Sequence, residues 1–206
     1  MTLPQRRIII GVTGASGAPY AVRLLQTLYE MPGIETHLVM SAWAKSNIET
    51  ETPHTVAEVA GLADVTYKLG EQGAAISSGS FRTGGMIVVP CSMRTLAAIR
   101  HGIADNLVSR AADVVLKERR RLVLVPRETP LNDIHLENML ALSRMGARIV
   151  PPMPAFYNHP ETIDDLLDHA VTRILDQFDI DAPQAKRWQG LTKTRRARNG
   201  AGADRI

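Results

Sequence analysis

The sequence predicts an α/β fold in which a single domain holds a doubly wound parallel sheet. Two observations support this. Short runs of Ile, Val and Leu occur without polar alternation, as in strands that are covered on both faces. Helical patterns separate these runs along the whole chain. The 206 residues match one domain by size, and a hydrophobic share of 45% can fill its core.

The predicted elements alternate in order. The strands are expected at residues 8–12, 36–40, 86–89, 122–125 and 148–150. The helices are expected at residues 18–30, 42–51, 95–100, 106–119, 133–145 and 162–178. Residues 67–85 are rich in Gly and Ser and are expected to form a loop. No internal repeat or linker divides the chain, so one domain is expected over residues 1–185.

A Gly-rich turn follows the first predicted strand. Gly11, Gly14 and Gly17 read G-x-x-G-x-x-G. This spacing differs from the dinucleotide pattern G-x-G-x-x-G and lacks the Lys of a Walker A loop. Backbone N–H groups and a helix N-terminus face anionic ligands at such turns. The turn therefore indicates a phosphate or a flavin rather than NAD or ATP.

The basic charge gathers at the C-terminal end. Residues 186–206 hold seven bases and one acid, a net charge of +6. Because the whole chain carries +3, residues 1–185 carry −3. We expect residues 186–206 to be a flexible, solvated tail, with nucleic-acid binding as the less favoured alternative.

The remaining composition indicates a cytoplasmic protein. Cys91 is the only cysteine, so no internal disulfide can form, which fits a reducing compartment. No apolar run approaches the roughly 20 residues that cross a bilayer, and the short run at residues 8–10 is no secretory signal. We therefore expect no membrane partner.

Three loops leave the carboxyl ends of predicted strands, where open α/β sheets bind their ligands. They are the Gly turn with Thr13 and Ser16, the segment 90–95 (Pro-Cys-Ser-Met-Arg-Thr) and the segment 126–130 (Pro-Arg-Glu-Thr-Pro). Each has an ordinary alternative, because hydroxyl residues cap helices and an Arg-Glu pair can be structural. Three such loops on one sheet edge favour a binding site. The stiff segment 151–157 is expected to wall a pocket, with the Tyr157 hydroxyl free to reach an anion.

Three other features have structural explanations. Asp164, Asp165 and Asp168 match the D-D-x-x-D magnesium motif, but acids in the first turns of a helix complement its dipole. No second acidic cluster accompanies them, so we reject a metal site. Cys91 is expected to be a packed small residue, and His135 a residue at a helix start.

The predicted helix at 106–119 carries a polar stripe opposite its apolar face. Asn106, Arg110, Asp113 and Lys117 form this stripe. It either faces solvent or lines a ligand cleft or a subunit contact.

Six motifs together resemble the UbiX-type flavin prenyltransferases. They are G-x-T-G-A-S-G-A near the start, S-S-G-S-F at 77–81, P-C-S-M-R-T at 90–95, R-A-A-D-V-V-L-K-E-R-R at 110–120, V-P-R-E-T-P at 125–130 and P-P-M-P-A-F-Y at 151–157. The resemblance covers roughly residues 7–190. It implies a flavodoxin-like Rossmann fold that binds FMN. It further implies transfer of a dimethylallyl group from dimethylallyl monophosphate to N5 and C6 of reduced FMN, which makes the cofactor of a UbiD-type decarboxylase.

The resemblance also implies roles for residues that match its motifs. FMN is expected to contact Gly14, Ala15, Ser16, Ser41, Ser92, Met93, Arg94, Thr95 and Arg127. The allylic substrate is expected to bind Lys117, Arg127, Tyr157 and Arg173. Catalysis is expected to involve Ser16, Glu51, Lys117 and Glu128. Lys117, Arg127 and Arg173 would charge-stabilise the leaving phosphate without a metal.

Two departures and two alternatives accompany this resemblance. Arg94 stands where relatives often carry Lys or Gly, and the short loop at 67–76 lacks the Trp that some relatives place over the substrate. One alternative is a flavin-dependent cysteine decarboxylase, and the other is a non-catalytic FMN-binding accessory subunit. Relatives form large homo-oligomers, so a dodecamer is expected.

Overall fold

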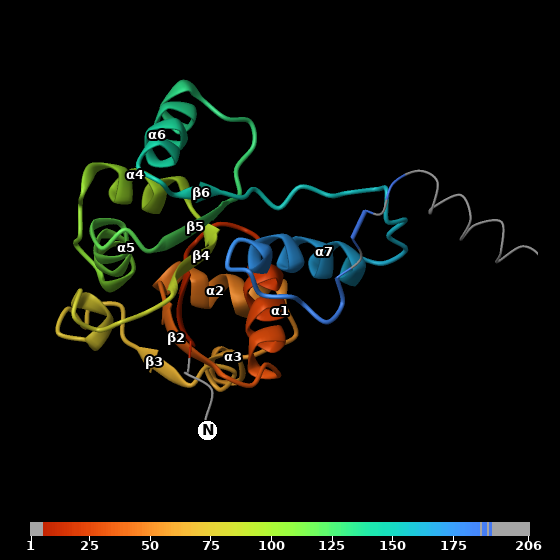
Figure 1. Cartoon of the computed structure of the whole chain (residues 1–206), viewed down its shortest axis with the longest axis horizontal. Helices are drawn as coiled ribbons and strands as arrows, with labels where there is room; N and C mark the ends of the chain where they lie inside the picture. Colours follow the sequence, from red (N-terminus) through yellow and green to blue (C-terminus); the bar gives the residue numbers. More distant parts are fainter. Residues whose placement is uncertain (1–5, 186, 189, 191–206) are drawn as a thin grey trace, which may run out of the picture.

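All six strands of the sheet run parallel, in the order β3-β2-β1-β4-β5-β6 (Figure 1). The computed structural model describes residues 6–185, 187, 188 and 190. The strands are β1 (Arg6–Val12), β2 (Ile34–Met40), β3 (Val65–Tyr67), β4 (Gly85–Cys91), β5 (Arg121–Pro126) and β6 (Arg148–Ile149). The chain adds β2 and β3 on one side of β1 and then β4, β5 and β6 on its other side, so the strand order reverses between β1 and β4. Open α/β sheets bind ligands at this point, outside the carboxyl ends of their strands.

Helices cover both faces of the sheet (Figure 1). They are α1 (Ala18–Tyr29), α2 (Ala42–Glu51), α3 (Val56–Ala60), α4 (Met93–His101), α5 (Leu107–Lys117), α6 (Asp133–Arg144) and α7 (Ile163–Asp176). The buried side chains of α1, α2, α3 and α7 pack on one face, and those of α4, α5 and α6 on the other. The predicted doubly wound parallel sheet is confirmed.

The differences from the predicted elements are short or lie at element ends. β3 has three residues and α3 has five, too few for a periodic pattern. α4 begins at Met93 rather than at residue 95 because Ser92 caps it. The expected loop at 67–85 contains one 3₁₀ turn, Ala75–Ser77.

Little of the predicted tail is described. In residues 186–206 the structure describes only Arg187, Trp188 and Gly190, so its predicted flexibility lies outside the described residues. Over the described ranges, none of the helices combines the length and the apolar character that a bilayer span requires.

Candidate active site

A cavity of about 830 Å³ opens at the carboxyl edge of the sheet, beside the β1–β4 reversal. Its volume lies in the range of small-molecule sites. The lining residues all fall between positions 13 and 109 and include five of the nine predicted flavin residues: Gly14, Ser41, Ser92, Arg94 and Thr95. The loops after β1, β2 and β4 therefore meet where the sequence predicts a binding site.

Buried Thr13 ties the Gly turn to the loop after β4. Its hydroxyl donates to the Pro90 carbonyl at 2.7 Å and accepts the Ser92 N–H at 2.9 Å. The Thr13 N–H also donates to the Pro90 carbonyl, at 3.3 Å. Two cavity loops are thus joined through one side chain.

The hydroxyl residues of the cavity also cap helices. Ser41 accepts from the Ala44 N–H at 3.1 Å and begins α2, and Ser92 accepts from the Thr95 N–H at 3.3 Å and begins α4. The ordinary capping role and a place in the cavity wall therefore coexist in these side chains. Arg94, exposed in the first turn of α4, adds a positive charge to this wall.

Trp43 packs so closely against Gly14 that no side chain fits at this position. A Cβ at Gly14 would stand 2.4 Å from the Trp43 Cβ, closer than real contacts allow. Trp43 is 71% exposed and lines the cavity, so its ring offers an apolar wall to a ligand. Trp43 was not predicted from the sequence, and neither was His101, which lines the cavity at the end of α4.

Glu51 binds the start of α1. Its Oε2 accepts the N–H groups of Gly17 and Ala18 at 2.7 and 2.9 Å. Asn47, on the same helix as Glu51, donates to the Ala15 carbonyl at 2.8 Å. From the sequence, this helix N-terminus was expected to bind an anionic ligand. The structure shows instead that the Glu51 carboxylate accepts hydrogen bonds from its N–H groups.

Ser16, Arg127 and Glu128 stand exposed at the same edge, outside the cavity lining. Arg127 lies near Tyr20 of α1: burial raises the pKa of Tyr20, and the nearby Arg127 charge lowers it in part. Glu128 accepts the N–H of its neighbour Thr129 at 3.1 Å rather than pairing with Arg127. Arg127 therefore stands close to the Gly-turn helix with its charge open to solvent.

Lys117 lies at the opposite edge of the sheet. It ends α5, and the chain enters β5 four residues later at Arg121. A helix that returns the chain to the start of a parallel strand ends at the amino edge. Ser109 lines the cavity eight residues earlier, roughly 12 Å away along the helix axis. Within one chain, Lys117 is not brought to the cavity.

Arg173 also lies toward the amino edge. It sits in the last turn of α7, where it is 54% exposed and pairs with Asp176 at 2.6 Å. Six residues further on, Asp179 pairs with Arg121, the first residue of β5, at 2.5 Å. Within one chain, Lys117 and Arg173 therefore lie away from the cavity.

Tyr157 lies in the segment that leads from β6 away to α7 (Figure 1). Its ring meets the rings of His169 and Trp188 edge-on, with centroids 5.7 and 5.5 Å apart. Burial lowers the pKa of His169, and the Arg173 charge lowers it further. The segment 151–157, expected to wall a pocket, lies outside the lining of the large cavity.

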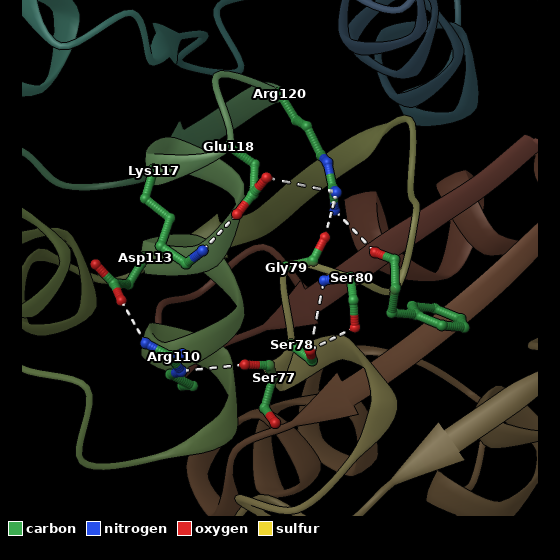
Figure 2. Close-up of polar contacts among 10 residues, drawn as sticks. Ser77, Ser78, Gly79, Ser80, Arg110, Asp113, Lys117, Glu118 and Arg120 are labelled. Atoms are coloured by element: carbon green, nitrogen blue, oxygen red, sulfur yellow. Dashed lines mark hydrogen bonds and ion pairs between the residues drawn. The ribbon is translucent and has the colours of Figure 1, made fainter.

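Arg110, in the polar stripe of α5, packs against the 3₁₀ turn Ala75–Ser77 (Figure 2). Arg110 donates to the Ser77 carbonyl at 3.2 Å and pairs with Asp113 at 2.7 Å. Asn106 instead caps α5 and lines the cavity. Arg110 is therefore only partly open to solvent and is held by the 3₁₀ turn of its own chain.

The structure assigns ordinary roles to Cys91 and His135. Burial raises the pKa of the Cys91 thiol to about 12, which rules out a thiolate nucleophile at neutral pH. His135 is the third helical residue in the capping box of α6.

The acidic motif is likewise structural. Arg23 of α1 pairs with Asp164 at 2.6 Å and with Asp168 at 3.4 Å, and Asp165 completes the capping box of α7. Among the described residues, no cluster of three or more His, Cys, Asp or Glu side chains could hold a metal ion.

Three comparisons place these features among known proteins. The Flavoprotein family model matches residues 1–175. Flavin prenyltransferase LpdB of Lactiplantibacillus plantarum is 57% identical over 186 residues, covering 90% of this chain and 100% of the relative.

Two solved structures share the fold and much of the sequence. A dodecameric FMN-dependent UbiX-like decarboxylase of Escherichia coli O157:H7 is 67% identical with a TM-score of 0.89, covering 89% of this chain and 100% of that one. AnUbiX (PadA1), in complex with FMN and dimethylallyl pyrophosphate, is 53% identical with a TM-score of 0.89, covering 91% and 99%.

Proposed function

The chain belongs to the UbiX-like flavin prenyltransferases, and we propose that it transfers a dimethylallyl group from dimethylallyl monophosphate to reduced FMN. The observation that carries the proposal is the cavity at the β1–β4 reversal, which five residues of the family's flavin motifs line. Prenyltransferase LpdB and the FMN-bound AnUbiX share most of this chain's length, which supports the same ligand here.

The cavity fits FMN in size and in chemistry. Its volume of about 830 Å³ accommodates a ring system with a ribityl phosphate. Ser41, Ser92 and Thr95 offer hydroxyls, and Arg94 offers a cation for a phosphate, while Trp43 offers an apolar wall. When bound, reduced FMN supplies the nucleophilic positions of the transfer. Ala15, Ser16, Met93 and Arg127 remain proposed contacts from the same loops.

We propose that the allylic phosphate binds between subunits. Lys117 and Arg173 lie at the amino edge of their own chain, so they can serve a cavity only in another copy. The Escherichia coli relative is dodecameric, and we propose the same assembly for this chain. Lys117, the last residue of the α5 polar stripe, would then lie at a subunit junction.

The chemistry needs positive charge and a proton acceptor. Lys117, Arg127 and Arg173 would stabilise the departing phosphate, so no metal is required. Tyr157 would add a hydroxyl to the same phosphate. Both hydrogen bonds that the described residues give Glu51 end on Oε2, which leaves Oε1 to accept a proton near the reacting centre. Ser16 and Glu128 complete the proposed catalytic group.

The product is proposed to pass to a UbiD-type decarboxylase in the cytoplasm. The two alternative functions give no role to Lys117 and Arg173, the cations that lie away from the FMN cavity. A cysteine decarboxylase or a flavin-storing accessory subunit would need the FMN cavity alone. The decisive difference is therefore prenyl transfer itself.

Mass spectrometry of the flavin tests the proposal. Anaerobic incubation with reduced FMN and dimethylallyl monophosphate should convert the flavin to a heavier, prenylated species. Parallel reactions with the diphosphate and with no prenyl donor show which donor is used. Unaltered FMN from a protein that binds FMN would support the accessory-subunit alternative and contradict the proposal.

A further inference from the structure

Arg120 holds the loop that follows the 3₁₀ turn by two backbone carbonyls (Figure 2). Its Nη2 donates to the Gly79 carbonyl at 2.6 Å and its Nη1 to the Phe81 carbonyl at 2.8 Å. The side chain is only 17% exposed, and Nη2 lies 4.0 Å from Glu118 Oε2. A planar guanidinium can bridge two acceptors in this way, whereas an ammonium cannot present the same fork.

The same loop also lies next to the Lys117 ammonium, at Gly79. Lys117 pairs with Glu118, and both groups lie directly over Gly79. A Cβ at Gly79 would stand 2.2 Å from Glu118 Oε1 and 2.8 Å from Lys117 Nζ, so a side chain at this position would push the pair aside. The Lys117 hydrogen bond and charge lower the pKa of Glu118, with a smaller effect from Arg120. The position of the Gly79 backbone therefore determines where the Lys117 ammonium can lie.

Two aromatic contacts anchor the far end of the loop. The Arg7 guanidinium lies 4.7 Å from the centroid of the Phe81 ring, and His37 meets that ring edge-on at 5.2 Å. At the other end, where the 3₁₀ turn leads into the loop, Arg110 donates a hydrogen bond to the Ser77 carbonyl. The loop is thus fixed at both ends, and Arg120 fixes its middle.

We infer that Arg120 is a positioning residue for Lys117, and through it for the phosphate of the allylic substrate. The inference rests on the proposed function, in which Lys117 contacts that phosphate. Arg120 fixes the Gly79 backbone over which Lys117 and Glu118 pair, so weakening its fork lets the ammonium shift. A point charge that shifts loses a charge-assisted contact to phosphate while the flavin cavity stays intact.

The test compares Arg120→Lys with Arg119→Lys in the full-length protein. Arg119 is exposed, and the described residues give its side chain no hydrogen bond or ion pair, so the same chemical change one residue away is a matched control. For Arg120→Lys we expect the KM for dimethylallyl monophosphate and the Ki of inorganic phosphate to rise about tenfold. The Kd for FMN should stay within about twofold, and kcat should change less than KM.

A second variant covers the case in which Arg120→Lys does not fold. Gly79→Ala keeps Arg120 but pushes the Lys117–Glu118 pair off the loop, and should give the same rise in KM. Equal behaviour of Arg120→Lys and Arg119→Lys in an active preparation would overturn the inference. Parallel losses of FMN affinity and melting temperature would also overturn it, since they indicate a role in the fold. Wild-type protein that makes no prenylated FMN would instead contradict the proposed function.

Discussion

Replacing Thr13 by Val removes the hydroxyl that joins two loops of the cavity. The buried hydroxyl makes hydrogen bonds of 2.7 Å to the Pro90 carbonyl and 2.9 Å from the Ser92 N–H. The Pro90 carbonyl keeps the Thr13 N–H, but the Ser92 N–H loses the acceptor that the structure gives it. One lost hydrogen bond and one unpaired amide together cost about 2 kcal/mol in unfolding free energy.

Ligand affinity should fall together with stability. Because the Gly turn and the Ser92 loop both line the cavity, Thr13→Val should weaken FMN binding by about tenfold. Thr13→Ser keeps the oxygen and loses a methyl group, which costs about 1 kcal/mol in stability and should leave FMN affinity unchanged.

Urea denaturation at one fixed protein concentration measures the first effect, because stability of an oligomer depends on concentration. Titration of FMN measures the second. Thr13→Val with wild-type stability would refute the hydrogen-bond argument. Equal FMN affinities in the Val and Ser variants would refute the claim that the tie shapes the cavity.

Three further perturbations have defined outcomes. Gly14→Ala should force the start of α2 at Trp43 away from the turn and weaken FMN binding by about tenfold or more, measured by calorimetry; unchanged affinity would contradict a tight fit between Gly14 and the Trp43 Cβ. Prenyl transfer should persist in EDTA, and Asp168→Asn should cost at most about 1 kcal/mol through its partly exposed pair with Arg23; a strict magnesium requirement would revive the acidic motif. Burial lowers the pKa of His37 despite its carboxylate neighbour, so the unfolded protein binds the extra proton as pH falls through about 6.5. The unfolding free energy should therefore drop as the pH falls below about 6.5 in the wild type and drop less in His37→Gln, and parallel curves would contradict this.

The strands and the cavity loops could be predicted because their signals are local. Apolar runs mark β1, β4 and β5, and the hydroxyl residues after β4 mark Ser92 as both a cap and a wall residue. Ser41 was identified only through the family resemblance. The missed features depend on contacts between distant segments. Nothing in the local pattern says that Glu51 binds the start of α1 from more than thirty residues away, or that Trp43 packs on Gly14.

The position of Lys117 could have been found from the topology alone. Motif resemblance grouped it with loops at the carboxyl edge, because a motif carries no information about which subunit supplies a side chain. A helix between two parallel strands ends at the amino edge, so Lys117 must lie there. Within one chain, that rule separates the cavity from Lys117.

Subunit complementation tests the two-chain site most directly. Gly14→Leu should destroy the cavity, and Lys117→Ala should remove a cation, so each homo-oligomer should fail to prenylate FMN. In mixed oligomers, verified by native mass spectrometry, the Lys117→Ala chain supplies an intact cavity and the Gly14→Leu chain supplies an intact Lys117. Prenyl transfer should return in the mixture, and mixed oligomers that stay inactive would contradict a site shared between two chains.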